Sequence, residues 1–314
     1  MLSYTAKRLA LVVPTLLFVS LVTFALAHFS ASDPITAKYS YLGITPDPAV
    51  LARERAAAGL NDPFLVQYAR WLFGAIHGDF GESYAYGADA GTEVLRRLPR
   101  TIWLAVATLV TTIMLALPMG LVAACYHGRW PDTLVRLFSF CGAAMPSFWV
   151  GLLLMYQFAV RWSWLPVMGS SSPRHIILPT ATLTFWLAAL YVRRLRGSLL
   201  EELGKDYVVG AIARGVPRHL VLWRDVLPNA LISVLPLVGL SVGALLGGAT
   251  IVESIFAWQG IGKMAVAATT VRDYPVLMAY VTWVSVIFVV ANAAVDLLGR
   301  AIDPQARRAA TGTR

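Results

Sequence analysis

Long apolar stretches alternate with polar connections along the whole chain. Six of these stretches approach the roughly 20 residues that a helix needs to cross the hydrocarbon of a bilayer. They span residues 9–28, 101–125, 134–160, 176–193, 230–252 and 276–298. Because backbone amide and carbonyl groups find no water in that environment, each stretch is expected to be a helix. The pattern therefore predicts an all-α, polytopic membrane protein with six transmembrane helices.

Composition strengthens this prediction. Of the 314 residues, 58% are hydrophobic and 14% are charged, whereas soluble domains carry about 25% charged residues. In a soluble protein, the net charge of +9 would suggest a nucleic-acid partner. In an inner-membrane protein, basic residues collect on the cytoplasmic side. We therefore expect a multi-pass protein of the cell (inner) membrane that contacts the lipid bilayer and no nucleic acid.

Basic residues in the connections set the predicted orientation. Lys7 and Arg8 precede the first stretch, and seven Lys and Arg residues lie within 193–229. If all six stretches cross the membrane, these regions and the basic tail share one side, so both termini are predicted to be cytoplasmic. Three arginines within 96–100 fall on the other side, in a long connection where the charge rule has less force.

The beginning of the chain has a second interpretation. Lys7 and Arg8, the apolar run after them and Ala25-Leu26-Ala27 together resemble a cleavable signal peptide. The run is about 17 residues long, which exceeds the usual 7–15 residues of a signal peptide's apolar region. We therefore expect the first helix to remain in the protein.

These features divide the chain into four predicted parts. They are an N-terminal transmembrane helix (1–28), an extracytoplasmic segment with short helices (29–100), a five-helix transmembrane core (101–303) and a cytoplasmic tail (304–314). In the extracytoplasmic segment, helices are expected over 49–60 and 63–76. The second has an apolar face at helical spacing, which suits either the membrane surface or a packed cap on the transmembrane helices.

The core includes a long cytoplasmic loop, residues 193–229, which carries a candidate docking element. The sequence from Asp206 onward predicts a short helix that is broken by Gly215 and Pro217. A short helix with apolar residues and a charged rim fits a groove on another protein. A solvated connector is the other interpretation of such a charged loop.

Small and polar residues within the apolar stretches give two further sets of candidates. Gly239, Gly243 and Gly247 recur every four residues, which lets helices approach closely, either within the subunit or against a second one. Polar residues in a span often mark a transport pathway. The candidate pathway residues are Gln157, Glu253 and Asn292.

The sequence lacks the usual signatures of an enzyme. It contains no His-x-x-x-His or Cys-x-x-Cys spacing and no Gly-Lys-Ser or Gly-Lys-Thr phosphate loop, so we predict no catalytic residues, no metal site and no cofactor. A secondary transporter, or another polytopic membrane protein without ATPase partners, is the alternative. It would be expected to show inverted repeats and charged residues near the bilayer midplane, and no clear repeat or midplane acid is visible.

The spacing in the cytoplasmic loop resembles a known signature. Gly215 is followed by nine residues, then Asp225, one residue and Leu227-Pro228. The loop signature of binding-protein-dependent ABC importer permeases ends in Gly, nine residues, Ile, one residue and Leu-Pro. The Gly, Leu and Pro match, whereas Asp225 replaces the Ile and Val209-Gly210 replaces the acidic start.

Further motifs are similar to those of the dipeptide, oligopeptide and nickel branch of this family. They are Gly59-Leu60-Asn61-Asp62-Pro63, Gly78-Asp79-Phe80-Gly81-Glu82-Ser83, Pro99-Arg100-Thr101, Met145-Pro146-Ser147-Phe148-Trp149, Glu253 to Gly262 and Arg272-Asp273-Tyr274-Pro275. One departure is Gln259, which stands where the branch usually has Pro before Gly260. The ordered motifs, and with them the resemblance, cover nearly the whole chain.

The resemblance implies a type I ABC importer permease core that is not itself an enzyme, with ATPase activity in separate subunits. The implied partners are a second homologous permease, two ABC ATPase subunits and an extracytoplasmic substrate-binding protein. The implied cargo is a peptide (dipeptide or oligopeptide) or nickel or another metal chelate, and Ser32-Asp33-Pro34 and Tyr41-Leu42-Gly43 look closest to the nickel members. The implied ATPase-coupling residues are Asp206, Tyr207, Ala211, Arg214, Gly215, Arg218, Leu227 and Pro228.

Overall fold

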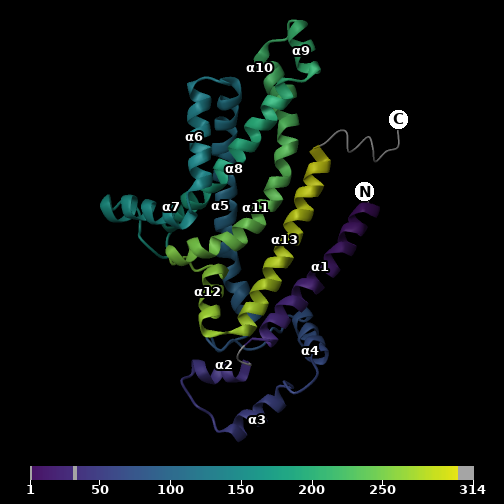
Figure 1. Ribbon diagram of the computed structural model, residues 1–314, viewed down its shortest axis with the longest axis vertical. Coiled ribbons are helices and arrows are strands. Elements are labelled where there is room, and N and C mark those ends of the chain that lie inside the picture. Colours follow the sequence, from purple (N-terminus) through teal and green to yellow (C-terminus); the bar gives the residue numbers. More distant parts are fainter. Residues whose placement is uncertain (1, 31–33, 303–314) are drawn as a thin grey trace. The chain divides into compact units, whose positions relative to one another are not determined.

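The computed structural model describes residues 2–30 and 34–302. The predicted cytoplasmic tail, 304–314, lies outside the described residues. Ser32 and Asp33, from the motif that looks closest to the nickel members of the family, also lie outside them. The α-helices are α1 (Leu2–His28), α2 (Pro34–Tyr41), α3 (Pro48–Ala57), α4 (Phe64–Ile76), α5 (Ala90–Cys125), α6 (Trp130–Ala144), α7 (Ser147–Leu154), α8 (Ile177–Leu203), α9 (Asp206–Ala213), α10 (Arg218–Val221), α11 (Leu227–Ile255), α12 (Ile261–Val271) and α13 (Tyr274–Ile302). Figure 1 shows their order along the chain. The described residues form no β-strand beyond an isolated bridge between Glu82 and Asp89, so the all-α prediction is confirmed.

Four segments of the described chain are long and apolar enough to cross a membrane. They span Ala90–Cys125, Pro173–Leu203, Arg218–Gly247 and Tyr274–Leu297. A bent helix pair, Trp130–Ala144 with Ser147–Arg161, would make a fifth crossing if it counts as one span. The apolar part of α1 found in the same way, Val12–His28, is shorter. The number of six spans and the cytoplasmic placement of both termini therefore remain predictions.

The third predicted stretch is not one helix. The sequence pattern predicts continuity over 134–160, but α6 ends at Ala144 and the chain turns by 106° before α7 begins. Met145 adopts an extended conformation with φ −87° and ψ 129°. A residue that precedes proline is disfavoured from the helical region, and Pro146 offers no amide to continue the ladder. The prediction of one helix over 134–160 is wrong for that reason.

Contacts between helices divide the structure into two compact units. The first unit comprises residues up to 101 and 259–289, and the second comprises 102–258 and residues from 290 onward. In the second unit, α8 packs against both α6 and α11, with α8 in the middle of the three (Figure 1). Leu187, Val192 and Leu199 on α8 are each 0% exposed. The candidate docking loop thus continues directly from the most deeply buried helix of its unit.

In the first unit, the apolar face of α4 packs onto α1. The ring of Phe24 lies 5.6 Å from the rings of Phe64 and Tyr68 and 5.7 Å from that of Trp71, measured between centroids. A hydrogen bond of 2.8 Å joins the Ser20 Oγ and the Tyr68 hydroxyl. Of the two interpretations that the sequence left open for this face, the structure favours the packed cap.

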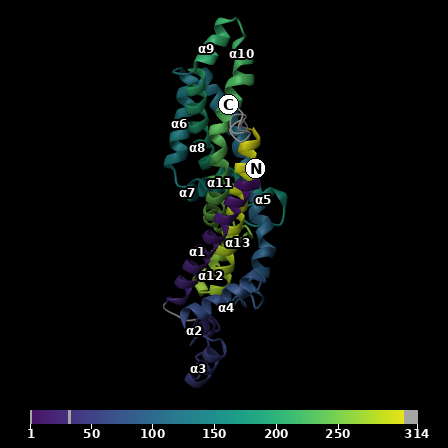
Figure 2. The ribbon, with the colours of Figure 1, turned by 90° about the vertical axis from the view of Figure 1, so that its right-hand side faces the viewer.

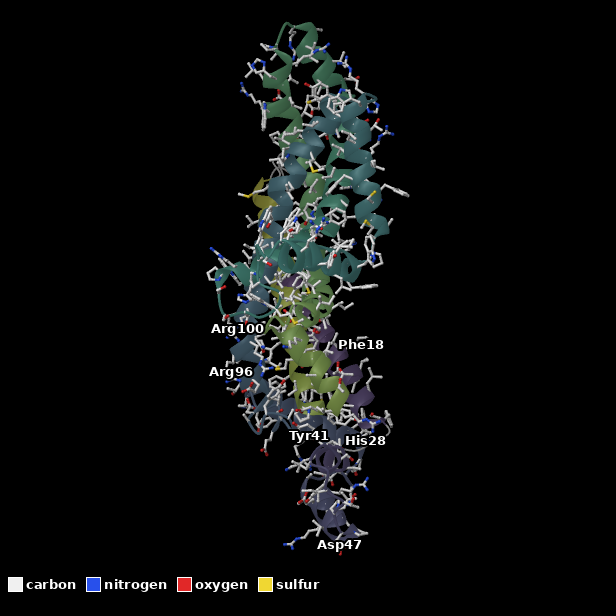
Figure 3. All side chains as sticks on the ribbon, turned by 90° about the vertical axis from the view of Figure 1, so that its left-hand side faces the viewer. Phe18, His28, Tyr41, Asp47, Arg96 and Arg100 are labelled. Atoms are coloured by element: carbon white, nitrogen blue, oxygen red, sulfur yellow. The ribbon has the colours of Figure 1, made fainter. Side chains whose placement is uncertain are left out.

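Helix α5 begins well before the predicted start at residue 101. Asp89 caps it, because its Oδ2 accepts a hydrogen bond of 2.7 Å from the Thr92 amide and one of 2.9 Å from the Thr92 hydroxyl. Arg96 and Arg100, one turn apart, therefore belong to this helix and project to the same side of it (Figure 3). Arginines that complicated the predicted orientation thus lie on an extracytoplasmic extension of α5 if the predicted topology holds.

Asp273 ties two distant motifs of the first unit together. Its side chain is buried, and Oδ2 accepts hydrogen bonds from the Ser83 hydroxyl at 2.6 Å and from the Ala85 amide at 3.1 Å. Its Oδ1 accepts one from the Val276 amide at 3.4 Å, at the start of α13. Hydrogen bonds to the Asp273 carboxylate therefore hold together the two sequence motifs that contain Ser83 and Asp273.

Replacing Asp273 by Ala is expected to destabilise the protein by about 3 kcal/mol. The change leaves the buried Ser83 hydroxyl and Ala85 amide without their acceptor, at roughly 1–3 kcal/mol, and removes the cap of α13, at about 1 kcal/mol. Thermal unfolding of the protein in detergent measures the loss. The control is Asp62→Ala, which removes an exposed ion pair with Arg70 and should cost less than about 1 kcal/mol. If Asp273→Ala and Asp62→Ala lowered the unfolding temperature by the same amount, the proposed role of Asp273 would be contradicted.

Candidate functional site: the α9–α10 loop

Helices α9 and α10 lie together at one end of the second unit, beyond α6 and α8 (Figures 1 and 2). Between them, Gly215 adopts φ +86°, a left-handed conformation that other residues rarely take. Pro217 then stands at the N-cap of α10, with φ −58°. The short helix that the sequence predicts, broken at Gly215 and Pro217, is therefore confirmed.

The loop is anchored by a few apolar side chains. Val208 and Val221 are each 1% exposed and Ala211 is 8% exposed, and all three belong to the core of the second unit. Because these side chains belong to the same core cluster as residues of α8 and α11, α9 is packed into the unit and is not a free connector. This argues against the solvated-connector interpretation.

The remaining apolar side chains of the loop are uncovered. They are Val209, Ile212, Val216, Leu220 and Trp223, which range from 37% to 59% exposed. Arg214, Arg218 and Arg224 are exposed among them and form no ion pair with any described residue. We call these eight residues the α9–α10 surface. Exposed apolar side chains on an anchored segment, with basic side chains among them, have the features of a protein–protein contact.

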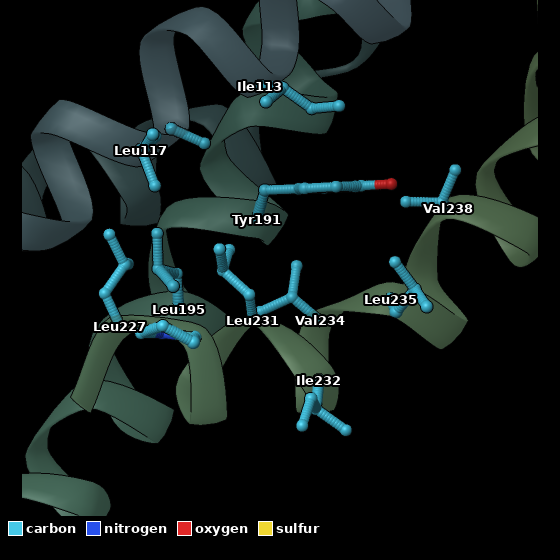
Figure 4. Close-up of a pocket in the computed structure, with 12 residues that line it drawn as sticks. Ile113, Leu117, Tyr191, Leu195, Leu227, Leu231, Ile232, Val234, Leu235 and Val238 are labelled. Carbon is cyan, nitrogen blue, oxygen red and sulfur yellow. The ribbon is translucent and has the colours of Figure 1, made fainter. Parts of the chain in front are cut away.

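The other predicted coupling residues have distinct surroundings. Asp206 is the exposed first residue of α9. Leu227, which is buried, and Pro228 begin α11 and line an apolar cavity of about 340 Å³ (Figure 4). Tyr191 and Leu195 of α8 face this cavity from the opposite helix. The loop signature therefore combines exposed residues with residues that belong to the core beneath the loop.

Tyr207 turns back toward its own chain. Its hydroxyl donates a hydrogen bond of 2.8 Å to Glu202 Oε2 at the end of α8, and the Lys205 ammonium donates one of 2.5 Å to Glu202 Oε1. The amide of Asn229, on α11, lies 3.4 Å from the Tyr207 hydroxyl. Glu202, Lys205 and Asn229 were not among the residues predicted from the sequence. The only local signal was the short spacing of Glu202, Lys205 and Tyr207.

The glycine repeat of α11 has two different environments. A Cβ added at Gly239 would lie 2.5 Å from Asn292 Oδ1, so α11 and α13 approach closely at this point. Gly247 has open space around it, and Gly243 is half-buried. At Gly239 the close contact is thus within the subunit, one of the two interpretations that the sequence left open.

The three candidate pathway residues lie on separate elements. Asn292 faces Gly239 as described, and Gln157 is half-buried in the π-helical turn Met155–Arg161 that follows α7. Glu253 is 0% exposed in the last turn of α11. Since Glu253 is fully enclosed, its carboxylate does not face an open mouth here. A pathway role for these residues remains a prediction.

Comparison with known proteins identifies the family. The sequence model described as binding-protein-dependent transport system inner membrane component matches residues 116–308, and the corresponding N-terminal model matches residues 1–105. The glutathione transport system permease proteins GsiC of Salmonella paratyphi A and of Escherichia coli K12 are each 36% identical over 307 residues, which cover 98% of this chain and 99% of theirs.

The fold agrees with these matches. A chain of the MetNI methionine ABC transporter in an inward-facing conformation superposes with a TM-score of 0.55 and 16% identity, over 67% of this chain and 96% of the other. At that identity the likeness shows the fold alone, which is that of a type I importer permease. Permeases of this kind act with a partner permease, ATPase subunits and a binding protein, and they are not enzymes. The chain belongs to the inner-membrane permease subunits of binding-protein-dependent ABC importers, in the peptide and nickel branch of that family.

Proposed function

We propose that this chain is one of two permease subunits in an ATP-driven importer for peptide-type substrates of which glutathione is an example. The support for the substrate class is the 36% identity to a glutathione permease along nearly the full length of both chains. The assembly would contain a second homologous permease, two ATPase subunits and an extracytoplasmic binding protein. In this proposal all six apolar stretches cross the membrane and both termini are cytoplasmic.

The observation that carries the proposal is the α9–α10 surface. Its apolar side chains are exposed although Val208 and Ala211 anchor the same helix in the core. In the assembled importer this surface would fill a groove on an ATPase subunit, with Arg214 and Arg218 beside acidic groups of that groove. Closure of the ATPases on ATP would then shift the permease pair between inward- and outward-facing populations.

Uptake measurements in cells that lack this gene test the substrate class. Labelled glutathione, labelled dipeptides and oligopeptides, and free or chelated nickel are compared with and without the restored gene. We expect restoration to raise uptake of glutathione or of the other peptides. Restoration of nickel uptake alone would contradict the peptide class and favour the metal members of the branch.

A pull-down with the tagged chain tests the ATP-driven class independently of cargo. We expect ATPase subunits and a second permease to copurify from membranes in mild detergent. Transport that continues after the ATPase genes are deleted would contradict the proposal and favour a secondary transporter.

A further inference from the structure

A buried carboxylate at the end of α8 occupies an unfavourable position. Glu202 lies next to the last residue of α8, Leu203, and is 9% exposed. A negative charge is disfavoured at a helix C-terminus and disfavoured again by burial. Such a group persists where partners satisfy it, and both oxygens of Glu202 have one. Lys205 Nζ lies 2.5 Å from Oε1, and the Tyr207 hydroxyl lies 2.8 Å from Oε2.

The hydrogen bonds continue from Tyr207 to the next transmembrane helix. Asn229 Nδ2 lies 3.4 Å from the Tyr207 hydroxyl and donates a bond of 2.9 Å to the Asp225 carbonyl. Partial burial raises the pKa of the Tyr207 hydroxyl, the hydrogen bond from Asn229 lowers it, and the bond to Glu202 raises it, so the pKa lies above its usual value. The hydroxyl therefore keeps its proton at physiological pH and remains a donor to Glu202. The polar chain links α8, the first turn of α9 and the start of α11.

The neighbouring residue provides a natural comparison. Glu201 is exposed and forms no ion pair with any described residue, although it carries the same charge one position earlier. The two glutamates thus differ in burial and in contacts, while their positions on α8 are adjacent. Of the two glutamates, Glu202 is the one whose side chain hydrogen-bonds to a described residue of α9, Tyr207.

We propose that Glu202, Tyr207 and Asn229 form a strut that fixes the angle of α9 to α8 and α11 and passes movement of the α9–α10 surface to these helices. The three are positioning residues, since Glu202 and Asn229 act through Tyr207. This inference rests on the proposed function, because it assigns to the strut the transmission of ATPase closure. Apolar anchoring by Val208 and Ala211 holds α9 in place, whereas directional hydrogen bonds fix its orientation.

The test is the number of substrate molecules transported for each ATP hydrolysed. The complete importer, with its ATPases and binding protein, is reconstituted in liposomes with labelled glutathione as the probe. Tyr207→Phe keeps the ring and removes only the hydroxyl, so we expect the ratio to fall about 5- to 10-fold, a typical size for coupling between sites. Asn229→Leu should lower the ratio in the same direction. Glu202→Gln, which keeps an acceptor for Tyr207, should lower it less than Tyr207→Phe does.

Two matched controls accompany these variants. Tyr39→Phe removes a tyrosine–glutamate hydrogen bond of 2.7 Å, to Glu54 Oε1, in the other unit. Glu201→Gln removes the neighbouring charge. Both should leave the ratio unchanged. Thermal unfolding is measured in parallel, because a purely structural role would lower stability in Tyr207→Phe and leave the ratio intact.

The outcomes separate the strut from the proposed function. If Tyr207→Phe transported as many substrate molecules for each ATP as the wild type, or if Tyr39→Phe lowered this ratio equally, the strut would be refuted. The proposed importer function would not be affected by either result. If the wild-type chain neither copurifies with ATPase subunits nor transports on ATP, the proposed function fails and the strut fails with it. A fall confined to the Tyr207, Asn229 and Glu202 variants, with ATPase binding retained, is the expected result.

Discussion

Gly215→Glu is expected to abolish uptake while the protein stays in the membrane at its wild-type level. No atom lies within 4 Å of a Cβ at this position, so the new side chain meets no steric clash, although the φ of +86° strains the backbone of any residue other than glycine. The carboxylate would, however, enter the α9–α10 surface between Arg214 and Val216 and meet the acidic groups proposed in the ATPase groove. An unpaired charge buried in an interface costs about 3 kcal/mol or more, which weakens binding roughly 100-fold. Uptake and immunoblots of isolated membranes measure the two effects.

Gly78→Glu is the matched control for this variant. Gly78 has φ +89°, close to the +86° of Gly215, and also has no atom within 4 Å of an added Cβ. Each glycine follows the C-cap of a short helix, α4 in one case and α9 in the other. Backbone strain is therefore similar in both variants, and only one touches the α9–α10 surface. Equal loss of uptake in both would attribute the effect to strain, and normal uptake in Gly215→Glu would refute the docking assignment.

Sequence periodicity predicts the helices well because the membrane requires long apolar runs. The central parts of α5, α8, α11 and α13 lie within the predicted stretches. The polar extensions at the ends of these helices were not predicted. Helix α5 extends over charged residues because Asp89 caps it early, and α8 runs on to Leu203 past its arginine cluster. Apolar length alone carries no information about these ends, since a helix can continue into water when its cap and packing allow it.

The break at Pro146 shows a different limit. Proline was visible in the sequence, but a proline within an apolar run can kink a helix, end it or be tolerated by neighbouring groups. The angle of 106° between α6 and α7 depends on how the surrounding helices pack against each of them. Pro236, inside the continuous helix α11, illustrates the tolerated case in the same chain.

Features of the site that depend on neighbouring residues in the sequence could be predicted. Features that depend on contacts between distant residues could not. The break at Gly215 and Pro217 follows from residue type, and the signature spacing points to the loop. The family resemblance placed Tyr207 among the coupling residues, and no sequence pattern distinguished it from the exposed members of that set. In the structure Val208 is buried as an anchor, and Tyr207 binds Glu202. The hydrogen bond between Ser83 and Asp273 joins positions 190 residues apart, a contact that no local pattern encodes.

The second large effect is a loss of stability, which is expected when the buried ion pair between Asp132 on α6 and Arg196 on α8 is broken. The Asp132 side chain, at the start of α6, is 1% exposed. Its Oδ1 accepts a hydrogen bond of 2.6 Å from Arg196 Nε, and its Oδ2 accepts one of 2.8 Å from Arg196 Nη2. The Gly128 amide donates a further bond of 3.0 Å to Oδ2. This bidentate, charge-assisted pair fastens the α5–α6 turn to α8.

Arg196→Met is expected to destabilise the protein by about 3 kcal/mol, as followed by thermal unfolding in detergent. Removing one partner of a buried pair leaves an uncompensated charge, which costs roughly 3–5 kcal/mol. The lower end is expected because Arg136 Nε lies 3.7 Å from Asp132 Oδ2 and can partly replace the lost guanidinium. Arg193→Met is the control, since Arg193 is exposed on the same helix and should change stability by less than about 0.5 kcal/mol.

The double variant Asp132→Leu with Arg196→Met decides what the pair contributes. Replacing both charges with apolar side chains of similar size removes the desolvation cost as well as the attraction, so most of the loss should be recovered. If the double variant is instead as unstable as Arg196→Met alone, the hydrogen bond from Gly128 and the geometry of the α5–α6 turn carry the stability. If it recovers stability but loses transport, the pair serves to orient α8 beneath the α9–α10 loop and contributes little to the free energy of folding.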